Sequence, residues 1–454
     1  MMTAGCFGEV KYIFYMIGDG MGANQVLAAE MYRAELQGRI GRVPLRMTSF
    51  PYTGYATTYS TSNSITDSPA GGTALACGVK TNNGGLAVDK DTTSVSSIAE
   101  EMHDAGWPVA LITSVAIDHA TPAAFYAHLQ GRKRYYEIGK RLAHTGFEFF
   151  GGAGFHQPVD PADTTAINLY DYCEQNGYTF AHGYKDAQAK LNAGKLIMVQ
   201  ADEGIDRTKS TDCLPYAIDR KEGDITLAQI TETALKYMES KGQFFMMIEG
   251  GMIDYSGHGR DGATNILETL DFDESIELVY QFYLAHPDET LIVVTADHET
   301  GGMSLGNGGK YVLNLQLLQN QKTSSWELNN SLRGLYAELG KRVTWEQVKQ
   351  LLQNTLGFYD QVPITDKEDA KLRAAHKRTL HGKQKDEKAL YNDISEIGGL
   401  AIGIINKKAK LGWSGSSHTA ANAPVFAIGV GADKFTGWYE NTEIVQKIRE
   451  IINE

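Results

Sequence analysis

The sequence predicts an α/β protein, a three-layer sandwich with a central, mostly parallel β-sheet covered by helices on both faces. Two observations lead to this prediction. Residues 12–17 (YIFYMI) and several later runs are almost continuously apolar, as strands buried on both faces are. These runs alternate along the chain with stretches of helical periodicity, and that alternation is typical of parallel sheets.

The predicted elements follow this alternation in chain order. One helix begins with a threonine that can act as its N-cap, and the last helix carries its apolar residues on one face. The elements are a strand over 12–17, a helix over 96–105, a strand over 109–113, a helix over 226–240, a strand over 244–248, a helix over 274–284, a strand over 291–295, a strand over 424–430 and a helix over 442–452.

Residues 1–454 are predicted to form a single domain, because no internal repeat or low-complexity linker divides them. The stretch from about 303 to 412 interrupts the alternation. It is polar, helix-patterned and rich in Gln, Asn and Lys. We interpret it as a helix-rich insertion that precedes His418.

Composition limits the classes of partner. Hydrophobic residues make up 42% and charged residues 21%, the balance of a folded, water-soluble protein. No apolar run approaches the roughly 20 residues that span a bilayer, so no transmembrane segment is predicted. The net charge of −13 argues against nucleic acid as a partner. If the ligand is an anion, bound cations and a few placed arginines must supply the positive charge.

The N-terminus and the cysteines say little about location. The first ten residues lack a basic segment and an apolar segment, so no complete signal peptide is predicted. Residues 3–6 resemble the end of a lipoprotein signal, although a trimmed N-terminus is the plainer interpretation. One or two disulfides are compatible with the sequence, but no pairing or metal spacing is evident among Cys6, Cys77, Cys173 and Cys213. Cys77 lies among small apolar residues and is predicted to be a packed thiol.

Polar side chains follow three of the predicted strands. Asp19 comes after the first strand, Glu249 after the strand over 244–248, and Asp297 with His298 after the strand over 291–295. In open parallel sheets, ligands bind beyond the carboxyl ends of the strands. The three positions therefore predict one shared site.

Ser68 is a candidate nucleophile. Residues 66–74 (TDSPAGGTA) have the pattern of a loop that turns into a helix, with Pro69 at the first helical position. Ser68 would then lie at a helix N-terminus, where free N–H groups and the helix dipole favour an anion. A serine there can attack phosphorus if its hydroxyl pKa is lowered. The alternative is that Ser68 only caps the helix.

Two histidine motifs suggest metal binding. Asp254 and His258 are four residues apart, so on a helix they would share one face and could share an ion. Asp297 and His298 precede a glycine turn, and their ligand atoms suit Zn²⁺. His418 is a lone histidine that by itself indicates a structural or exposed side chain. Two metal ions together form the known clamp for displacement at phosphorus.

The set of motifs resembles the alkaline phosphatases, in the same order and from about residue 11 to 432. The resemblance rests on residues 17–22 (IGDGMG), 66–70 (TDSPA), 120–123 (ATPA), 249–258 (EGGMIDYSGH), 295–299 (TADHE) and 417–419 (SHT). It implies hydrolysis of phosphate monoesters with broad specificity through a phosphoserine intermediate. It also implies a homodimer that works in the periplasm or at the cell surface, with small phosphate monoesters and inorganic phosphate as ligands.

The resemblance also implies roles for individual residues. Ser68 would be the phosphorylated nucleophile, and Arg132, eleven residues after Thr121, would grip two phosphate oxygens. The first zinc ion would be bound by Asp254, His258 and His418, and the second by Asp19, Asp297 and His298. A third ion, usually magnesium, would be bound by Asp19, Thr121 and Glu249.

Two positions differ from the best-known bacterial pattern. His119 replaces an aspartate near the third ion, and Tyr255 replaces a lysine near the phosphate. A histidine there should weaken magnesium retention and allow zinc to compete. Loss of the lysine removes a positive charge beside the phosphate. We therefore expect easier product release and a more metal-sensitive enzyme.

Other functions remain open from the residues. A phosphodiesterase, a sulfatase or a cofactor-independent phosphoglycerate mutase could share the fold. Pro69 directly after Ser68, and glycine at position 72, disfavour a sulfatase, and Arg132 favours monoesters. A non-catalytic phosphate- or metal-binding protein is a further alternative, whereas nothing in the sequence supports a structural surface protein.

Overall fold

The computed structural model describes residues 9–163, 165–200, 207–391 and 393–454. The lipoprotein-like run at residues 3–6 lies outside this part of the chain. Cys77, Cys173 and Cys213 are free thiols, so no disulfide joins these three. Cys77 is buried, as predicted for a packed thiol.

A ten-stranded sheet forms the centre of the described structure, in the order β16-β2-β15-β10-β1-β9-β4-β6-β8-β7. Strand β15 is antiparallel to both of its neighbours, and every other recorded pairing in this sheet is parallel. The strands are β1 (Tyr12–Ile17), β2 (Tyr52–Thr57), β4 (Val109–Thr113), β6 (Phe149–Gly151), β7 (Thr179–His182), β8 (Leu196–Val199), β9 (Phe244–Glu249), β10 (Thr290–Thr295), β15 (Ala423–Gly429) and β16 (Gly437–Glu440). The mostly parallel sheet of the prediction is confirmed.

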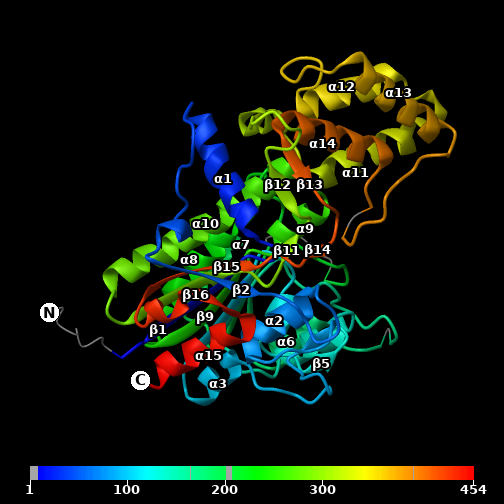
Figure 1. Ribbon diagram of the computed structural model, residues 1–454. Helices are drawn as coiled ribbons and strands as arrows, with labels where there is room; N and C mark the ends of the chain where they lie inside the picture. The colour runs from blue at the N-terminus through cyan, green and yellow to red at the C-terminus, as the bar shows by residue number, and fades with distance from the viewer. Residues whose placement is uncertain (1–8, 164, 201–206, 392) are drawn as a thin grey trace.

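Helices cover both faces of this sheet (Figure 1). One face carries α1 (Ala23–Leu36), α7 (Gly183–Ala189), α8 (Leu227–Glu239) and α10 (Gly262–Ala285). The other carries α2 (Ser68–Cys77), α3 (Ile98–Asp104), α4 (Ala120–Ala123), α5 (Tyr135–Leu142), α6 (Leu169–Gln175) and α15 (Asn441–Ile452). None of the helices in the described residues is long and apolar enough to cross a membrane.

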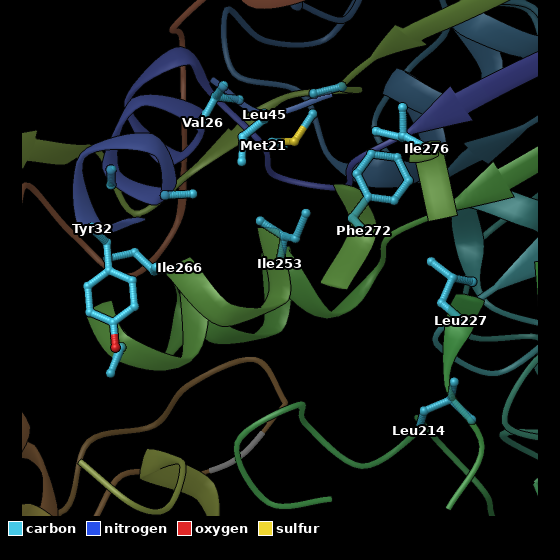
Figure 2. Packing of buried hydrophobic residues seen from close by; sticks show 14 of the residues in the cluster. Met21, Val26, Tyr32, Leu45, Leu214, Leu227, Ile253, Ile266, Phe272 and Ile276 are labelled. Atoms are coloured by element: carbon cyan, nitrogen blue, oxygen red, sulfur yellow. The ribbon is translucent and has the colours of Figure 1, made fainter. Parts of the chain in front are cut away.

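The two cores follow from the alternation of side chains along each strand. In β1, Phe14 and Met16 belong to one core, and Ile13 and Tyr15 to the other. Figure 2 shows part of the first core, where Phe272 of α10 packs near the sheet. Full burial of such a side chain contributes about 1.5–3 kcal/mol, so the central strands are held from both sides.

Most predicted elements agree with the structure, and α10 shows why one did not. Thr226 caps α8 in a capping box, as predicted. The helix predicted over 274–284 begins at Gly262 instead, where the Asp261 side chain accepts a hydrogen bond from Thr264 N–H. Its first half buries polar residues such as Asn265 among apolar ones. Because polar side chains there face the interior, hydropathy shows no single apolar face.

The stretch predicted as an insertion forms a helical block above the sheet (Figure 1). Its ends meet, because β12 (Met303–Leu305) pairs antiparallel with β13 (Leu411–Trp413). Between them lie η2 (Leu315–Asn320), α11 (Ser325–Leu339), η3 (Gly340–Arg342), α12 (Trp345–Leu356), α13 (Asp366–Leu380) and α14 (Glu396–Ala409). The remaining elements are η1 (Met47–Ser49), β3 (Gly85–Leu86), β5 (Leu129–Gln130), α9 (Met252–His258), β11 (Glu299–Thr300), β14 (His418–Thr419) and η4 (Ala432–Phe435).

The register of the central strands brings the candidate residues to one edge. Ile17 at the end of β1 is level with Glu249 of β9 and with Thr295 of β10. Glu249 is the last residue of its strand rather than the first residue after it. The carboxyl ends of three adjacent parallel strands therefore meet at one place, as expected for a ligand site.

Candidate active site

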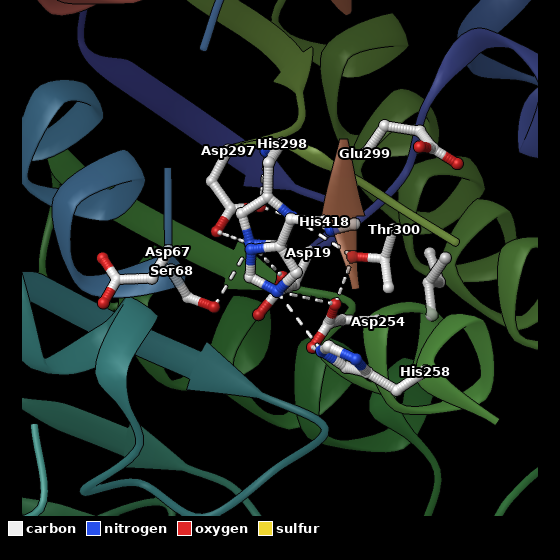
Figure 3. Close-up of polar contacts among 12 residues, drawn as sticks. Asp19, Asp67, Ser68, Asp254, His258, Asp297, His298, Glu299, Thr300 and His418 are labelled. Atoms are coloured by element: carbon white, nitrogen blue, oxygen red, sulfur yellow. Dashed lines mark hydrogen bonds and ion pairs between the residues drawn. The ribbon is translucent and has the colours of Figure 1, made fainter. Parts of the chain in front are cut away.

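Ser68 is not the cap of α2. The side chain of Asp67 accepts a hydrogen bond from Ala70 N–H at 3.1 Å and is the N-cap. Ser68 is the first helical residue and Pro69 the second, one position later than predicted. With capping done by its neighbour, the Ser68 hydroxyl is free to face the site, and its Oγ lies 3.2 Å from His298 Nε2 (Figure 3).

Asp254, His258 and His418 form the first ligand group. Asp254 and His258 lie four residues apart on α9, and Asp254 Oδ2 is 3.3 Å from His258 Nε2. His418 Nε2 lies 3.6 Å from Asp254 Oδ1. The other ring nitrogens face backbone carbonyls, His258 Nδ1 that of Ser416 at 2.7 Å and His418 Nδ1 that of Thr66 at 2.9 Å. A proton on Nδ1 leaves Nε2 as the ligand atom, the usual arrangement around a bound metal.

Asp19, Asp297 and His298 form the second group, and all three side chains are fully buried. His298 Nε2 lies 3.3 Å from Asp19 Oδ1 and 3.2 Å from Asp297 Oδ2. Asp297 Oδ1 accepts a hydrogen bond from Gly20 N–H at 3.3 Å, which ties the turn after β1 to the turn after β10. The same His298 nitrogen faces Ser68, so the nucleophile candidate borders this group.

A two-stranded sheet brings His418 to the site. β11 pairs antiparallel with β14, and Thr300 is opposite His418. Thr300 Oγ1 donates a hydrogen bond to Asp254 and lies 3.3 Å from His298 Nδ1. This pairing places His418, whose ligand role the resemblance implied but its local sequence did not, beside ligands more than 100 residues earlier.

A third set of candidate ligands also lies together. The ligand atoms that lie together belong to Asp19, His119 and Glu249. Thr121 is adjacent, since its hydroxyl donates a hydrogen bond to Asp19 Oδ2 at 3.4 Å. Thr113 donates a hydrogen bond to Glu249 Oε2. The predicted residues are therefore together, with His119 among the ligand atoms.

Arg132 lies beside this third group, and its guanidinium has no ion-pair partner among the described residues. Its Nη2 donates a hydrogen bond to His119 Nε2 at 2.7 Å and to the hydroxyl of Tyr391 at 3.4 Å. No carboxylate of the described residues forms an ion pair with Arg132, although most arginines here have one. A guanidinium held by neutral groups keeps its charge for an anionic ligand.

The buried carboxylates of the site have too few positive charges and hydrogen-bond donors around them. Burial, followed by the charge of neighbouring carboxylates, raises the pKa of Asp19 and Asp297 well above the usual range. Burial likewise raises the pKa of Glu249 to about 7. One oxygen on each of four side chains has no hydrogen-bond partner, namely Asp19 Oδ1, Glu249 Oε1, Asp254 Oδ2 and Asp297 Oδ2. Buried acceptors without donors are costly, so this donor set fits cations.

Burial lowers the pKa of three of the four histidines and so favours the neutral form in which histidine binds metals. Burial, followed by the charge of Arg132, lowers the pKa of His119 to about 3. Burial also lowers the pKa of His298 and His418. For His258, burial lowers the pKa, but the Asp254 carboxylate and the hydrogen-bonded Ser416 carbonyl together raise it above its usual value.

Several site residues were missed by the sequence interpretation. Tyr391 comes from the helical block, and nothing in its local sequence indicates a role. Its ring stacks on Tyr255 with centroids 3.5 Å apart. Tyr255 is buried, and its hydroxyl donates a 3.4 Å hydrogen bond to Asp212, which also faces His156.

Thr300, the other site residue that the sequence interpretation missed, could have been found, since it directly follows the motif over 295–299.

This fold and this site define an α/β protein whose buried site, at the carboxyl edge of a mostly parallel sheet, is suited to bound metal ions. The sequence model of the family described as Alkaline phosphatase matches residues 10–147 and 200–453. The chain belongs to the alkaline phosphatase family. It is accordingly an enzyme of the phosphomonoester-hydrolysing class.

Individual relatives cover almost the whole chain. Alkaline phosphatase 4 of Bacillus subtilis is 30% identical over 98% of this chain and 89% of its own length. Alkaline phosphatase 3 of the same organism is 28% identical over 97% and 88%. The crystal structure of the cold-active alkaline phosphatase from the psychrophile Shewanella sp. is similar with a TM-score of 0.79, at 26% identity and covering 98% of this chain and 100% of that one.

Proposed function

We propose that this enzyme hydrolyses phosphate monoesters of broad identity through a phosphoserine on Ser68. The single observation that carries the proposal is the position of Ser68 Oγ, 3.2 Å from His298 Nε2 and beside the second ligand group. Asp67 performs the capping, so the hydroxyl of Ser68 has no structural task at the helix end.

We propose two zinc ions and a third, magnesium-type ion in this site. The first zinc would be bound by Asp254, His258 and His418, and the second by Asp19, Asp297 and His298. The third ion, magnesium or zinc, would be bound by Asp19, Glu249 and Thr121 with His119 beside them. When bound, such ions lower the pKa of a nucleophile and neutralise charge on the leaving oxygen.

The reaction consists of two displacements. Ser68 Oγ first gives up its proton to solvent and forms a bond to phosphorus while the P–O bond to the alcohol breaks, and the alcohol leaves with a proton from solvent. A water oxygen then forms a bond to phosphorus while the Ser68 Oγ–P bond breaks, and the serine recovers its proton. Arg132 holds two non-bridging oxygens throughout, and the N-terminal end of α2 adds a favourable dipole. Two inversions give net retention at phosphorus.

The monoester assignment can be tested against the diesterase alternative. A monoester has three non-bridging oxygens and a diester only two, so only a monoester can offer two of them to Arg132 and still present a third to the ligand groups. No carboxylate of the described residues forms an ion pair with this arginine. We expect aryl phosphate monoesters to be hydrolysed with a kcat/KM at least 100-fold above that of the matching diesters, in the presence of Zn²⁺ and Mg²⁺. A preference for diesters would reject the proposal in favour of the alternative.

Ser68→Ala tests the nucleophile. We expect loss of more than 1,000-fold in kcat with unchanged zinc content, because the acceptor of the phosphoryl group is gone. Ser64→Ala, an exposed position in the same loop, serves as the matched control and should keep full activity. Incubation with radioactive phosphate at mildly acidic pH should label the wild type at Ser68. A metal-loaded wild type that incorporates no label would contradict the intermediate.

The cellular setting is a proposal from the family resemblance. We propose that the enzyme works in the periplasm or at the cell surface and forms a homodimer. Cell fractionation tests the first statement and sedimentation equilibrium the second. Recovery only in the cytoplasm, or a monomer at micromolar concentration, would overturn the respective statement.

A further inference from the structure

The loop between α13 and α14 carries one residue of the helical block into the active site. Glu387 and Ile394 close the loop with two reciprocal backbone hydrogen bonds of 2.9 Å. Glu387 also forms an ion pair with Arg260, two residues after His258. Ser395, where α14 begins, donates from its hydroxyl to Asn329 of α11 at 2.6 Å. The base of this loop is thus attached both to its own block and to the segment after α9.

Tyr391 lies within this loop and contacts three parts of the site. Its ring is nearly parallel to that of Tyr255, at an interplanar angle of 14°. It meets His258 of the first ligand group edge to face, with centroids 5.3 Å apart. Its hydroxyl accepts the hydrogen bond from Arg132 Nη2. The stacking determines where the ring lies, and the ring position determines where the hydroxyl meets the guanidinium.

The partners of Arg132 are neutral. His119 accepts the hydrogen bond of Arg132 at Nε2, which a doubly protonated imidazole cannot do, and the other acceptor is the hydroxyl of Tyr391. Arginine has five N–H donors, and at most three are used by these groups. The guanidinium therefore stays oriented while its charge and at least two donors remain for a ligand. Holding a flexible side chain in place before binding reduces the entropy lost when the ligand arrives.

We propose that Tyr391 is a positioning residue for phosphate, which orients Arg132 for its contact with the non-bridging oxygens. The inference rests on the proposed function. On this proposal, the helix-rich insertion predicted for about 303–412 contributes a residue to phosphate binding. A purely structural role would instead use only the ring of Tyr391, as an anchor stacked on Tyr255.

The Tyr391→Phe variant separates these roles, because it keeps the ring and removes the hydroxyl. We expect the KM for an aryl phosphate and the Ki of inorganic phosphate to rise about three- to tenfold, the value of one ordinary hydrogen bond, because this bond is long at 3.4 Å. Zinc content should be unchanged, and kcat should fall less than twofold. Tyr336→Phe is the matched control: it removes a tyrosine hydroxyl from the same block, where the partner is His376. It should leave all three constants unchanged.

A double-mutant cycle shows whether Tyr391 acts through Arg132. In an Arg132→Ala background, Tyr391→Phe should change the Ki of inorganic phosphate less than twofold, because its target is absent. Equal effects in both backgrounds would overturn the proposal. So would a Tyr391→Phe variant with wild-type Ki beside a Tyr391→Leu variant with a raised one, since only the ring would then matter. If Arg132→Ala itself leaves the Ki unchanged, the proposed function fails instead.

Discussion

At the scale of single residues, capping and catalysis are divided between two neighbours. Asp67 satisfies an N–H group at the start of α2, and Ser68 is left to face the ligand groups. Residue preference does not distinguish the two, because aspartate and serine are equally favoured as N-caps. Only the backbone conformation distinguishes them, with Asp67 extended at φ −101° and ψ 169°.

Asp67→Ala should therefore lower stability by about 1 kcal/mol, the usual value of an N-cap. Asp67→Asn should be close to wild type, because asparagine caps equally well. Unfolding in guanidinium chloride with metals present measures both. If the alanine variant is as stable as the asparagine variant, the Asp67 cap contributes nothing.

His119→Asp tests the third group. Its low pKa, about 3, keeps His119 uncharged at any working pH, and it is hydrogen-bonded to Arg132. A carboxylate adds a negative charge and a hard oxygen ligand, so we expect the magnesium concentration for half-maximal activity to fall roughly tenfold after chelation. His144→Asp, at an exposed position, is the control. An unchanged magnesium requirement in His119→Asp would place His119 outside the third site.

At the scale of elements, short pieces of structure align the ligands. β11 and β14 are only two residues each, yet their pairing joins the turn after β10 to His418. Gly301 N–H donates to the carbonyl of Ser417 at 2.9 Å, directly beside that histidine. Such a pairing is stable only because the surrounding core supports it, since an isolated pair of this length has almost no stability.

Gly301→Ala should disturb this alignment. Gly301 has φ +89°, and a Cβ there would lie 2.5 Å from the ring of Trp413. We expect reduced zinc content and at least tenfold lower activity, because the clash with Trp413, added to backbone strain of about 1–3 kcal/mol, shifts β14. Gly306→Ala has a similar φ of +86° with nothing within 4 Å and serves as the control. Equal losses in both variants would attribute the effect to positive φ alone.

At the scale of the whole molecule, an acidic protein has to bind an anion. The net charge of −13 is compatible with a phosphate site because the buried carboxylates suit cations and Arg132 is not neutralised. Glu268 is a buried acid of another kind, because no ion pair links it to a cation of the described residues. Burial, followed by the charge of Asp271, raises the pKa of Glu268 in α10 to about 8. Its Oε1 accepts a hydrogen bond from Ala217 N–H at 2.7 Å.

Glu268→Gln should stabilise the protein at alkaline pH. The folded state keeps a proton on Glu268 that the unfolded state releases near pH 4.5, so wild-type stability falls as the pH rises from there to about 8. The variant lacks this loss, and its Tm should exceed that of the wild type by a gap that widens to pH 8 and then levels off. Calorimetry from pH 5 to 9 measures it. A gap independent of pH would refute the raised pKa.

Glu277→Gln on the same helix is the contrast. The pKa of Glu277 is lowered, because its ion pair with Arg46 outweighs burial. Its contribution is present above the unfolded pKa and is lost as the pH falls. This variant should therefore be slightly less stable than the wild type at neutral pH, with a gap that narrows on acidification.

The sequence by itself determined the local elements and the motifs at their ends. Strands such as β1 and β4 have the predicted bounds, because a run buried on both faces is apolar at every position. Asp19, Glu249 and Asp297 could be expected together, since parallel strands end at one edge. The first half of α10 was not predicted, because its buried polar residues obscure the helical periodicity of hydrophobic positions.

Only the tertiary structure decided which distant residues complete the site. His418 is placed by pairing with Thr300, His119 by its approach to Asp19 and Glu249, and Tyr391 by a loop that reaches Arg132 across 259 positions. Periodicity and motif spacing describe neighbours along the chain. Contacts between remote segments depend on how the whole core packs, and no local pattern records that.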